Sequence, residues 1–174
     1  MLIKPKKSLG QNFLHDENII NKIINASKIS SDDQVLEVGP GTGNLTKLII
    51  SQKPKKIYVV EKDKSLAAEL EKQYYNKINI INEDILKITN EFYSGKKFLI
   101  LGNLPYNIST KILSNWCLNN KLNVSKMILM FQKEVAERIL ANVNSKEYSR
   151  ITILSKWKFD IRKITDVKPN SFFP

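Results

Sequence analysis

Four consecutive residues, Asn103, Leu104, Pro105 and Tyr106, have the chemistry to hold the exocyclic amine of a nucleobase. They follow the apolar run 98–101, which predicts a buried strand whose carboxyl end is a ligand-binding position in open α/β sheets. The Asn103 side chain and the Leu104 carbonyl offer two acceptors beside the fixed turn at Pro105. Tyr106 offers a flat face for a flipped base. Two acceptors would hold the N–H hydrogens and leave the nitrogen free to attack an electrophile. The alternative is a plain proline turn after a core strand.

Three alternate glycines, Gly39, Gly41 and Gly43, form a second motif between the apolar segment 35–38 and the helical pattern 44–50. Glycines at a strand-to-helix turn permit positive φ and close approach of a ligand to the backbone. The spacing G-x-G-x-G does not complete the dinucleotide fingerprint G-x-G-x-x-G in either register. The motif therefore favours a nucleotide-like cofactor other than NAD.

Carboxylates stand at the ends of the predicted strands around this loop. Glu61 ends the apolar strand 57–60, 22 residues after Gly39, where an acid can accept both ribose hydroxyls. Glu37, directly ahead of the glycines, adds negative charge suited to a cationic cofactor. Asp84 follows the next predicted strand and can accept from the amino group of an adenine ring. Its alternative role is that of a helix N-cap.

The elements that must position these residues alternate along the chain, because helical periodicity and short apolar runs follow one another. The predicted helices span 16–26, 44–51, 64–75, 109–119, 133–141 and 149–157. The predicted strands span 34–38, 57–61, 78–82, 98–102, 126–131 and 159–167. This alternation predicts an α/β fold in which a mainly parallel sheet carries helices on both faces. The length of 174 residues allows one full domain with a sizeable core.

Together these residues resemble the KsgA (RsmA) family of ribosomal RNA adenine dimethyltransferases, which use S-adenosylmethionine. The resemblance covers nearly the whole chain in ordered strings, of which the first and fifth are specific to this family and its close relatives. The strings are 8–14, 37–43, 60–63, 83–84, 102–110, 131–136 and 168–174. The resemblance implies a Rossmann-like S-adenosylmethionine-dependent methyltransferase fold, with residues 1–174 forming the cofactor-binding catalytic domain.

The resemblance also assigns cofactor-binding positions in this chain. They are Gln11, Asn12 and Leu14 at the methionine end, Glu37, Gly39, Gly41 and Gly43 at the glycine loop, Glu61 at the ribose with Lys62 beside it, Asp84 and Ile85 at the adenine, and Asn103 between cofactor and target amine.

By the same resemblance, the catalytic residues are Asn103, Leu104, Pro105 and Tyr106, and the target adenine stacks on Tyr106. Phe172 corresponds to a family aromatic near the active site and is expected against the other face of the base. The sulfonium methyl is already activated, so the site has to align the N6 lone pair with the methyl carbon. Acceptors at Asn103 and Leu104 would favour a pyramidal nitrogen, and no strong base is needed.

The net charge of +11 and the pI near 9.6 fit a polyanionic partner, although a solvated surface in a lysine-rich protein would have the same composition. Lys4, Lys6 and Lys7 precede the Gln11 motif, where an RNA backbone would pass. Contacts to phosphate would add affinity without sequence choice. We therefore expect small-subunit rRNA, within the 30S particle, as the partner.

Several classes of protein are not expected. Cys117 is the only cysteine and His15 the only histidine, so neither a disulfide framework nor a metal site is predicted. Cys117 lies within an apolar helical pattern and is expected to be buried. There is no signal core and no apolar stretch of membrane length, which favours a cytoplasmic protein without a membrane partner. We expect a monomer.

Three functions remain open. The favoured one is N6,N6-dimethylation of two adjacent adenosines near the 3′ end of small-subunit (16S) rRNA during ribosome biogenesis. The related large-subunit rRNA methyltransferase of the macrolide-resistance type is the second. A non-catalytic ribosome-assembly or transcription factor on the same fold is the third. Family members continue past Pro174 with a last strand and a C-terminal helical domain, so this chain is expected to be the catalytic domain only.

Overall fold

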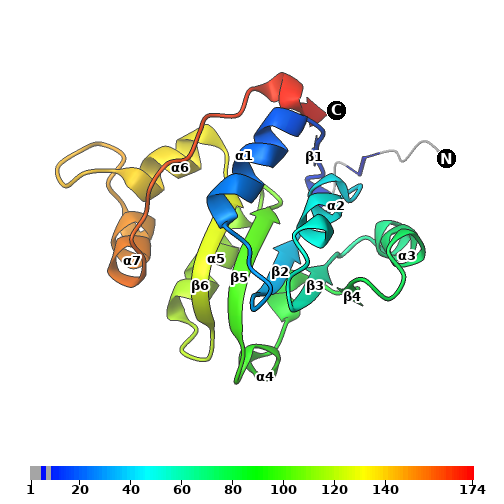
Figure 1. Ribbon diagram of the computed structural model, residues 1–174. Helices are drawn as coiled ribbons and strands as arrows, with labels where there is room; N and C mark the ends of the chain where they lie inside the picture. The colour runs from blue at the N-terminus through cyan, green and yellow to red at the C-terminus, as the bar shows by residue number, and fades with distance from the viewer. Residues whose placement is uncertain (1–4, 7–8) are drawn as a thin grey trace.

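Five parallel strands form the central sheet of the computed structural model, which describes residues 5–6 and 9–174 (Figure 1). The order across the sheet is β4-β3-β2-β5-β6, and every neighbouring pair is parallel. The strands are β2 (Gln34–Val38), β3 (Lys56–Val60), β4 (Asn79–Ile81), β5 (Lys97–Asn103) and β6 (Asn123–Met130). The predicted α/β fold with a mainly parallel sheet is confirmed.

Helices pack on both faces of this sheet (Figure 1). They are α1 (Glu17–Ser27), α2 (Asn44–Ser51), α3 (Lys64–Gln73), α4 (Asn90–Tyr93), α5 (Ser109–Leu118), α6 (Lys133–Leu140) and α7 (Arg150–Lys158), with short 3-10 turns at η2 (Ile85–Lys87) and η3 (Pro169–Ser171). None of the helices in the described ranges is long and apolar enough to span a bilayer. Over the same residues, no three histidine, cysteine, aspartate or glutamate side chains gather closely enough to hold a metal ion.

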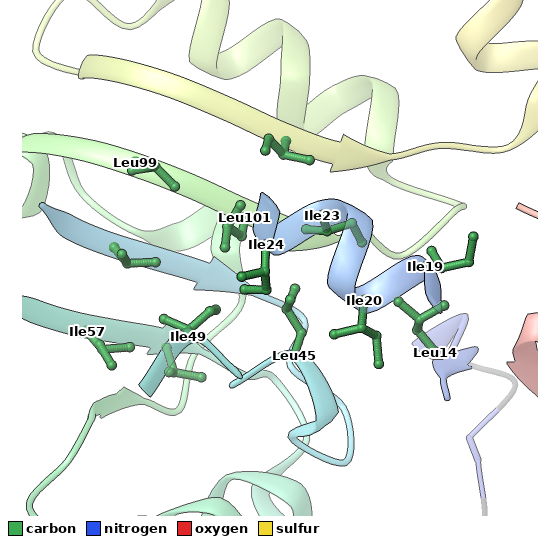
Figure 2. Close-up of a cluster of buried hydrophobic side chains, with 13 residues drawn as sticks. Leu14, Ile19, Ile20, Ile23, Ile24, Leu45, Ile49, Ile57, Leu99 and Leu101 are labelled. Carbon is green, nitrogen blue, oxygen red and sulfur yellow. The ribbon is translucent and has the colours of Figure 1, made fainter. Parts of the chain in front are cut away.

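Alternate residues of each central strand face opposite layers of the core, as the period of two requires. Val35 and Leu99 pack in the layer under α1 and α2, whereas Leu36 and Ile100 pack in the layer that contains residues of α4 and α5. Figure 2 shows the first of these layers. Burial of an isoleucine or leucine side chain contributes about 1.5–3 kcal/mol, so these layers hold the strand ends in place.

Helix α1 shows how the first layer is assembled from sequence. Asp16 is its N-cap and accepts hydrogen bonds from the backbone N–H groups of Asn18 and Ile19. Its isoleucines recur at helical spacing, and Ile20 and Ile23 point with their neighbours into the buried layer (Figure 2). The helix is thereby fixed against the sheet directly after the segment that carries Gln11.

A second, two-stranded sheet joins the two ends of the chain and was not predicted. Strand β1 (Phe13–Leu14) pairs antiparallel with β7 (Phe172–Phe173), with Leu14 opposite Phe172. The Ser171 side chain donates to the carboxylate of Asp16 at 2.7 Å, and the His15 backbone N–H donates to the Ser171 carbonyl at 3.0 Å. The C-terminal segment therefore helps to fix the segment that precedes α1.

One predicted element is wrong. Residues 159–167, predicted as a strand, form no strand in the structure. Phe159 and Ile161 instead pack against a small apolar cluster that includes Leu113, Cys117 and Ile139. Cys117 is buried there, as predicted, and burial raises the pKa of its thiol to about 11.

Candidate active site

A pocket opens at the carboxyl ends of β2, β3 and β5. The strand order reverses between β2 and β5, and such a switch point is where open α/β sheets form a ligand crevice. The lining residues come from the segment before β1, the glycine loop, the ends of β3 and β4, and the turn after β5. They are Leu9, Gly10, Gln11, Asn12, Phe13, Val38, Gly39, Gly41, Val60, Glu61, Lys62, Leu66, Glu83, Asp84, Ile85, Asn103, Leu104, Pro105, Tyr106, Asn107 and Ile108.

The glycine loop needs its glycines for both conformation and space. Gly39 and Gly41 have φ of 69° and 57°, a region that disfavours other L-residues. A Cβ at Gly39 would lie 2.7 Å from the Asn103 carbonyl oxygen, and one at Gly41 would lie 2.7 Å from the Phe13 ring. Gly43 also has positive φ but faces α3 and does not line the pocket. Bare backbone at Gly39 and Gly41 therefore forms the floor of the pocket.

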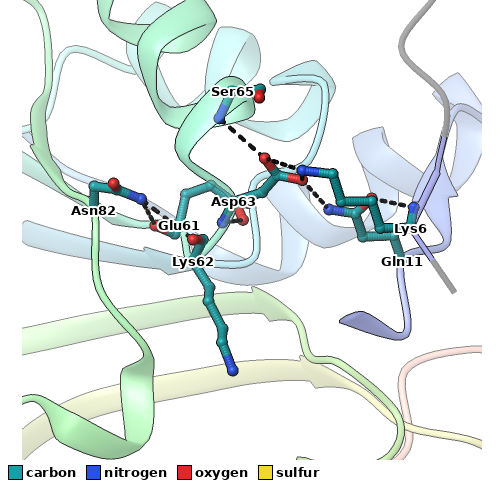
Figure 3. Close-up of polar contacts among 7 residues, drawn as sticks. All are labelled: Lys6, Gln11, Glu61, Lys62, Asp63, Ser65 and Asn82. Atoms are coloured by element: carbon teal, nitrogen blue, oxygen red, sulfur yellow. Dashed lines mark hydrogen bonds and ion pairs between the residues drawn. The ribbon is translucent and has the colours of Figure 1, made fainter. Parts of the chain in front are cut away.

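Glu61 lines the pocket, and hydrogen bonds from Asp63 and Asn82 fix its position. Its Oε1 accepts the backbone N–H of Asp63 at 2.8 Å, and its own carbonyl accepts the Asn82 side-chain amide at 2.8 Å (Figure 3). The side chain is buried, and this burial is the main cause that raises the pKa of the Glu61 carboxyl above its ordinary value. A ligand that brings hydroxyl donors would stabilise the charged form.

Asp84 is a helix N-cap, one of the two roles that the sequence left open, and it also lies in the pocket lining. Its Oδ1 accepts the Leu86 backbone N–H at 3.0 Å and caps η2, while the residue also lines the pocket beside Ile85. Its Oδ2 pairs with the Lys62 ammonium at 2.9 Å. Burial raises the pKa of Asp84, but the bonds from Lys62 and Leu86 together lower it below its usual value. The carboxylate is therefore charged at neutral pH.

Asn103, at the end of β5, is oriented by one side-chain hydrogen bond among the described residues. Its Nδ2 donates to the Asn12 carbonyl at 2.6 Å, which leaves its Oδ1 as an acceptor. Leu104 is fully buried and anchors the turn, while Tyr106 is half-buried at the pocket. Burial raises the pKa of the Tyr106 hydroxyl, so the ring is neutral at neutral pH.

Glu37 lies in a different place from the one its charge suggested. The side chain is 1% exposed, does not line the pocket, and accepts the Thr46 hydroxyl at 2.7 Å on Oε2. Its Oε1 has no hydrogen-bond partner in the described part of the chain. Burial raises the pKa of Glu37 to about 8, so the group is largely neutral at neutral pH and does not supply the expected negative charge. It ties the strand before the glycine loop to α2.

Other predicted residues are also separate from the pocket lining. Leu14 is buried in the core layer, and its carbonyl accepts the Asn44 side-chain amide at 2.9 Å. Phe172 packs against that same layer through β7. Neither lines the pocket. Of the amino-terminal lysines, Lys6 pairs with a carboxylate of the body, while Lys4 and Lys7 lie outside the described residues.

The carboxylate that pairs with Lys6 is Asp63, a residue to which the sequence analysis gave no role. Its side chain is 3% exposed and also accepts from Gln11 Nε2 at 3.0 Å and from the Ser65 backbone N–H at 3.0 Å. The available signal was an acid directly before the helical pattern of α3, which is typical of an N-cap. That signal predicts the bond to Ser65 only.

The family comparison agrees with this arrangement. A family model described as ribosomal RNA adenine dimethylase matches residues 3–174. The chain belongs to this family. The curated relatives include proteins named ribosomal RNA small subunit methyltransferase A, two of them from Pelagibacter ubique and Malacoplasma penetrans. The one from Pelagibacter ubique is 52% identical over 100% of this chain and 67% of its own length. The one from Malacoplasma penetrans is 46% identical over 97% of this chain and 61% of its own length.

Solved structures of similar proteins support the same family. A dimethyladenosine transferase from Plasmodium falciparum is 38% identical with a TM-score of 0.72, over 83% of this chain and 52% of that one. The 23S rRNA methyltransferase ErmE is 25% identical with a TM-score of 0.67, over 83% of this chain and 55% of that one. The chain thus spans 52–67% of the length of these four proteins.

Proposed function

We propose that this chain is the cofactor-binding catalytic part of an S-adenosylmethionine-dependent rRNA adenine N6,N6-dimethyltransferase. Its substrate would be two adjacent adenosines near the 3′ end of small-subunit (16S) rRNA in the 30S particle, which implies a cytoplasmic location. The observation that carries the proposal is the orientation of Asn103, whose Nδ2 is engaged by Asn12 and whose Oδ1 is left to accept at the pocket. The names of the small-subunit relatives support the substrate class.

The pocket fits S-adenosylmethionine. Gly39 and Gly41 line the pocket with backbone alone, because a Cβ at either position would clash with the Asn103 carbonyl oxygen or the Phe13 ring. Glu61 supplies a buried acceptor suited to ribose hydroxyls. Asp84 supplies a charged acceptor for an adenine amino group next to the apolar Ile85. When bound, S-adenosylmethionine supplies an activated methyl group on a sulfonium.

The chain's own residues would prepare the target amine. Asn103 Oδ1 and the Leu104 carbonyl would accept the two N–H hydrogens of adenine N6, and Tyr106 would stack on the base. Because the acceptors hold hydrogens rather than the lone pair, they favour a pyramidal, more nucleophilic nitrogen as methyl transfer proceeds. Transfer would break the bond between sulfur and methyl carbon and leave N6 cationic, and the now acidic N6 proton would pass to water. Rotation of the remaining N–H toward an acceptor would then allow a second transfer.

The alternative functions are less well supported. A large-subunit methyltransferase of the macrolide-resistance type would be expected to resemble ErmE most, yet ErmE is 25% identical and the small-subunit relatives reach 52%. A non-catalytic assembly or transcription factor would not need Asn103 to be oriented with a free acceptor at the pocket. The intact geometry of Asn103 and Tyr106 therefore favours catalysis.

Cofactor binding is tested by calorimetry and thermal melting of the chain with S-adenosylhomocysteine. Binding to the native state raises the melting temperature by mass action, and NAD should produce no shift. Glu61→Gln keeps an acceptor for the Asp63 N–H but loses charge, and should weaken binding by about 1–3 kcal/mol. Glu69→Gln on the exposed face of α3 is the matched control. Absence of both heat and melting shift at millimolar ligand would refute the proposal.

A further inference from the structure

We propose that Asp63 is a positioning residue for the cofactor pocket, because its carboxylate holds Gln11 and the pocket-lining stretch 9–13 in place. The inference rests on the proposed function of the pocket. Asp63 itself does not line the pocket and would act through Gln11, which does. Figure 3 shows the carboxylate between the start of α3 and the amino-terminal segment.

The Asp63 carboxylate is saturated by donors from three places. Oδ1 accepts the Ser65 backbone N–H at 3.0 Å, and Lys6 Nζ lies 3.0 Å from Oδ1 and 2.9 Å from Oδ2. Oδ2 also accepts Gln11 Nε2 at 3.0 Å. Gln11 in turn accepts the Lys6 backbone N–H on its Oε1 at 2.7 Å. Lys6 and Gln11 are thereby joined to each other and to the same buried group.

This set of contacts exceeds what a helix cap requires. An N-cap needs one side-chain oxygen, which serine or asparagine supplies about as well as aspartate. The second oxygen and the charge of Asp63 serve Lys6 and Gln11, which lie 57 and 52 positions earlier in the chain. Burial raises the pKa of Asp63, but the donors from Lys6, Gln11 and Ser65 together lower it below its usual value. The charge is therefore present at neutral pH.

Asp63 also connects two walls of the pocket. Its backbone N–H donates to the Glu61 carboxylate at 2.8 Å, while its side chain holds Gln11 on the opposite, amino-terminal wall. The stretch 9–13 has further attachments, because Asn103 bonds the Asn12 carbonyl and Phe13 pairs in β1. Loss of the Asp63 carboxylate should therefore leave the chain folded but loosen the wall that carries Gln11.

Two variants separate this role from helix capping. Asp63→Ser keeps an oxygen for the Ser65 N–H but removes the charge and the reach to Lys6 and Gln11. Lys6→Met leaves the cap untouched and removes one of the two side chains that the carboxylate holds. Lys133→Met, from an exposed ion pair on α6, removes the same charge as Lys6→Met at a distance from the pocket. The double variant that combines Asp63→Ser with Lys6→Met completes a double-mutant cycle, which measures whether the two side chains act together.

The measurements are amide hydrogen exchange in the free chain and the release rate of S-adenosylhomocysteine. Asp63→Ser should raise exchange in 9–13 but not in α3, and should speed release by about 3- to 10-fold, because charge-assisted bonds are lost. Lys6→Met should speed release of S-adenosylhomocysteine by about 2- to 3-fold, since the half-exposed Lys6 ammonium makes a weaker ion pair. Adding Lys6→Met to Asp63→Ser should change nothing further, and Lys133→Met should match wild type.

Unchanged release in both single variants would overturn the proposal, as would effects that add fully in the double variant. If Asp63→Ser also raises exchange in α3, helix capping is disturbed as well. The effect of Lys6→Met on release then decides whether the carboxylate positions the pocket, because Lys6→Met leaves the helix cap unchanged. If wild-type chain does not bind S-adenosylhomocysteine, the proposed function fails separately. In that case unchanged exchange of 9–13 in both variants would still refute the structural role of Asp63, and increased exchange would support it.

Discussion

At the scale of single residues, Asn103 is defined by the hydrogen bond that it donates. The Asn12 carbonyl accepts from Nδ2 at 2.6 Å, so the amide places a donor toward Asn12 and keeps Oδ1 as an acceptor for the pocket. Aspartate would set a carboxylate against a carbonyl oxygen, and leucine would supply no acceptor. Asn103 therefore depends on the stretch that carries Gln11, and the two parts of the site are coupled through Asn12.

Asn103→Ala in the full-length enzyme should lower the rate of methyl transfer by about 10²–10³, which is typical for loss of one preorganised contact to a transition state. RNA affinity should change little, since the target amine is the only RNA group that the side chain is proposed to contact. Single-turnover transfer to unmethylated 30S particles measures the first effect and filter binding the second. Asn21→Ala on the exposed face of α1 serves as control. Transfer at the wild-type rate would remove Asn103 from the mechanism.

Glu37 should make stability depend on pH. Its pKa is raised from 4.5 to about 8 by burial, so the folded chain binds a proton that the unfolded chain releases in that window. Stability from this group is full below about pH 4.5 and is lost as pH rises toward about 8, on the order of a few kcal/mol. Glu37→Gln keeps an acceptor for Thr46 and should lack this loss. Urea denaturation at several pH values measures this loss, with Glu69→Gln as control. If the unfolding free energies of wild type and Glu37→Gln change in parallel with pH, the raised pKa of Glu37 is contradicted.

The acids of the site show what sequence can and cannot predict about residues. Glu61 and Asp84 were predicted at strand ends, and both line the pocket, because the end of a parallel strand is a local property. Glu37 obeys the same rule but its side chain faces α2, so its charge is suppressed by burial. Two partners of the Asp63 carboxylate, Lys6 and Gln11, lie 57 and 52 positions away and are set by tertiary packing, which no local pattern encodes.

At the scale of elements, short apolar runs and helical periodicity were sufficient for the five central strands and for helices α2, α3 and α5 between them. The four-residue helix α4 was not predicted. These patterns were insufficient where pairing is non-local. Residues 159–167 alternate like a strand, but a strand forms only with a partner along its edge, and Phe159 packs elsewhere. Conversely, β1 and β7 are two residues each, too short to show any period, and exist because distant ends of the chain meet.

Helix α1 is held on the sheet by a contact that can be tested. Lys126 on β6 donates to the Ala26 carbonyl at 3.1 Å and to the Ser27 carbonyl at 2.9 Å, at the carboxyl end of the helix. A cation there satisfies free carbonyls and opposes the helix dipole. Lys126→Met should cost about 1–2 kcal/mol of unfolding free energy. Urea denaturation measures it, with exposed Lys121→Met as control; equal stability of the two variants would show that the contact contributes nothing.

At the scale of the whole molecule, one edge of the sheet collects every proposed catalytic group. The switch between β2 and β5 brings the glycine loop beside Asn103, and Gly39 permits their contact. A side chain at Gly39 would force apart the cofactor floor and the proposed methyl acceptor site. The proximity of donor and acceptor thus follows from strand order and one missing Cβ. The chain as a whole carries a net charge of +11.

That charge leads to the last prediction, which concerns RNA. The chain spans 61–67% of the length of two of its curated relatives, so a full-length relative is the reference for its choice of site. Binding to short single-stranded RNA should then come mainly from lysines on phosphates, with little preference between an adenosine-pair sequence and a scrambled one. With about five phosphate contacts, affinity should fall on the order of 10²-fold between about 50 and 200 mM salt.

Fluorescence anisotropy across a salt series measures this slope for both RNAs. In parallel, methyl incorporation into unmethylated 30S particles compares the chain with a full-length relative of equal cofactor affinity. The chain should be much slower, because phosphate contacts position RNA but do not specify which adenosines enter the pocket. A flat salt dependence would show that the basic surface is merely solvated. Equal methylation rates and equal choice of site would show that residues 1–174 already contain the whole recognition surface. No other segment would then be required to bring two adjacent adenosines to Asn103.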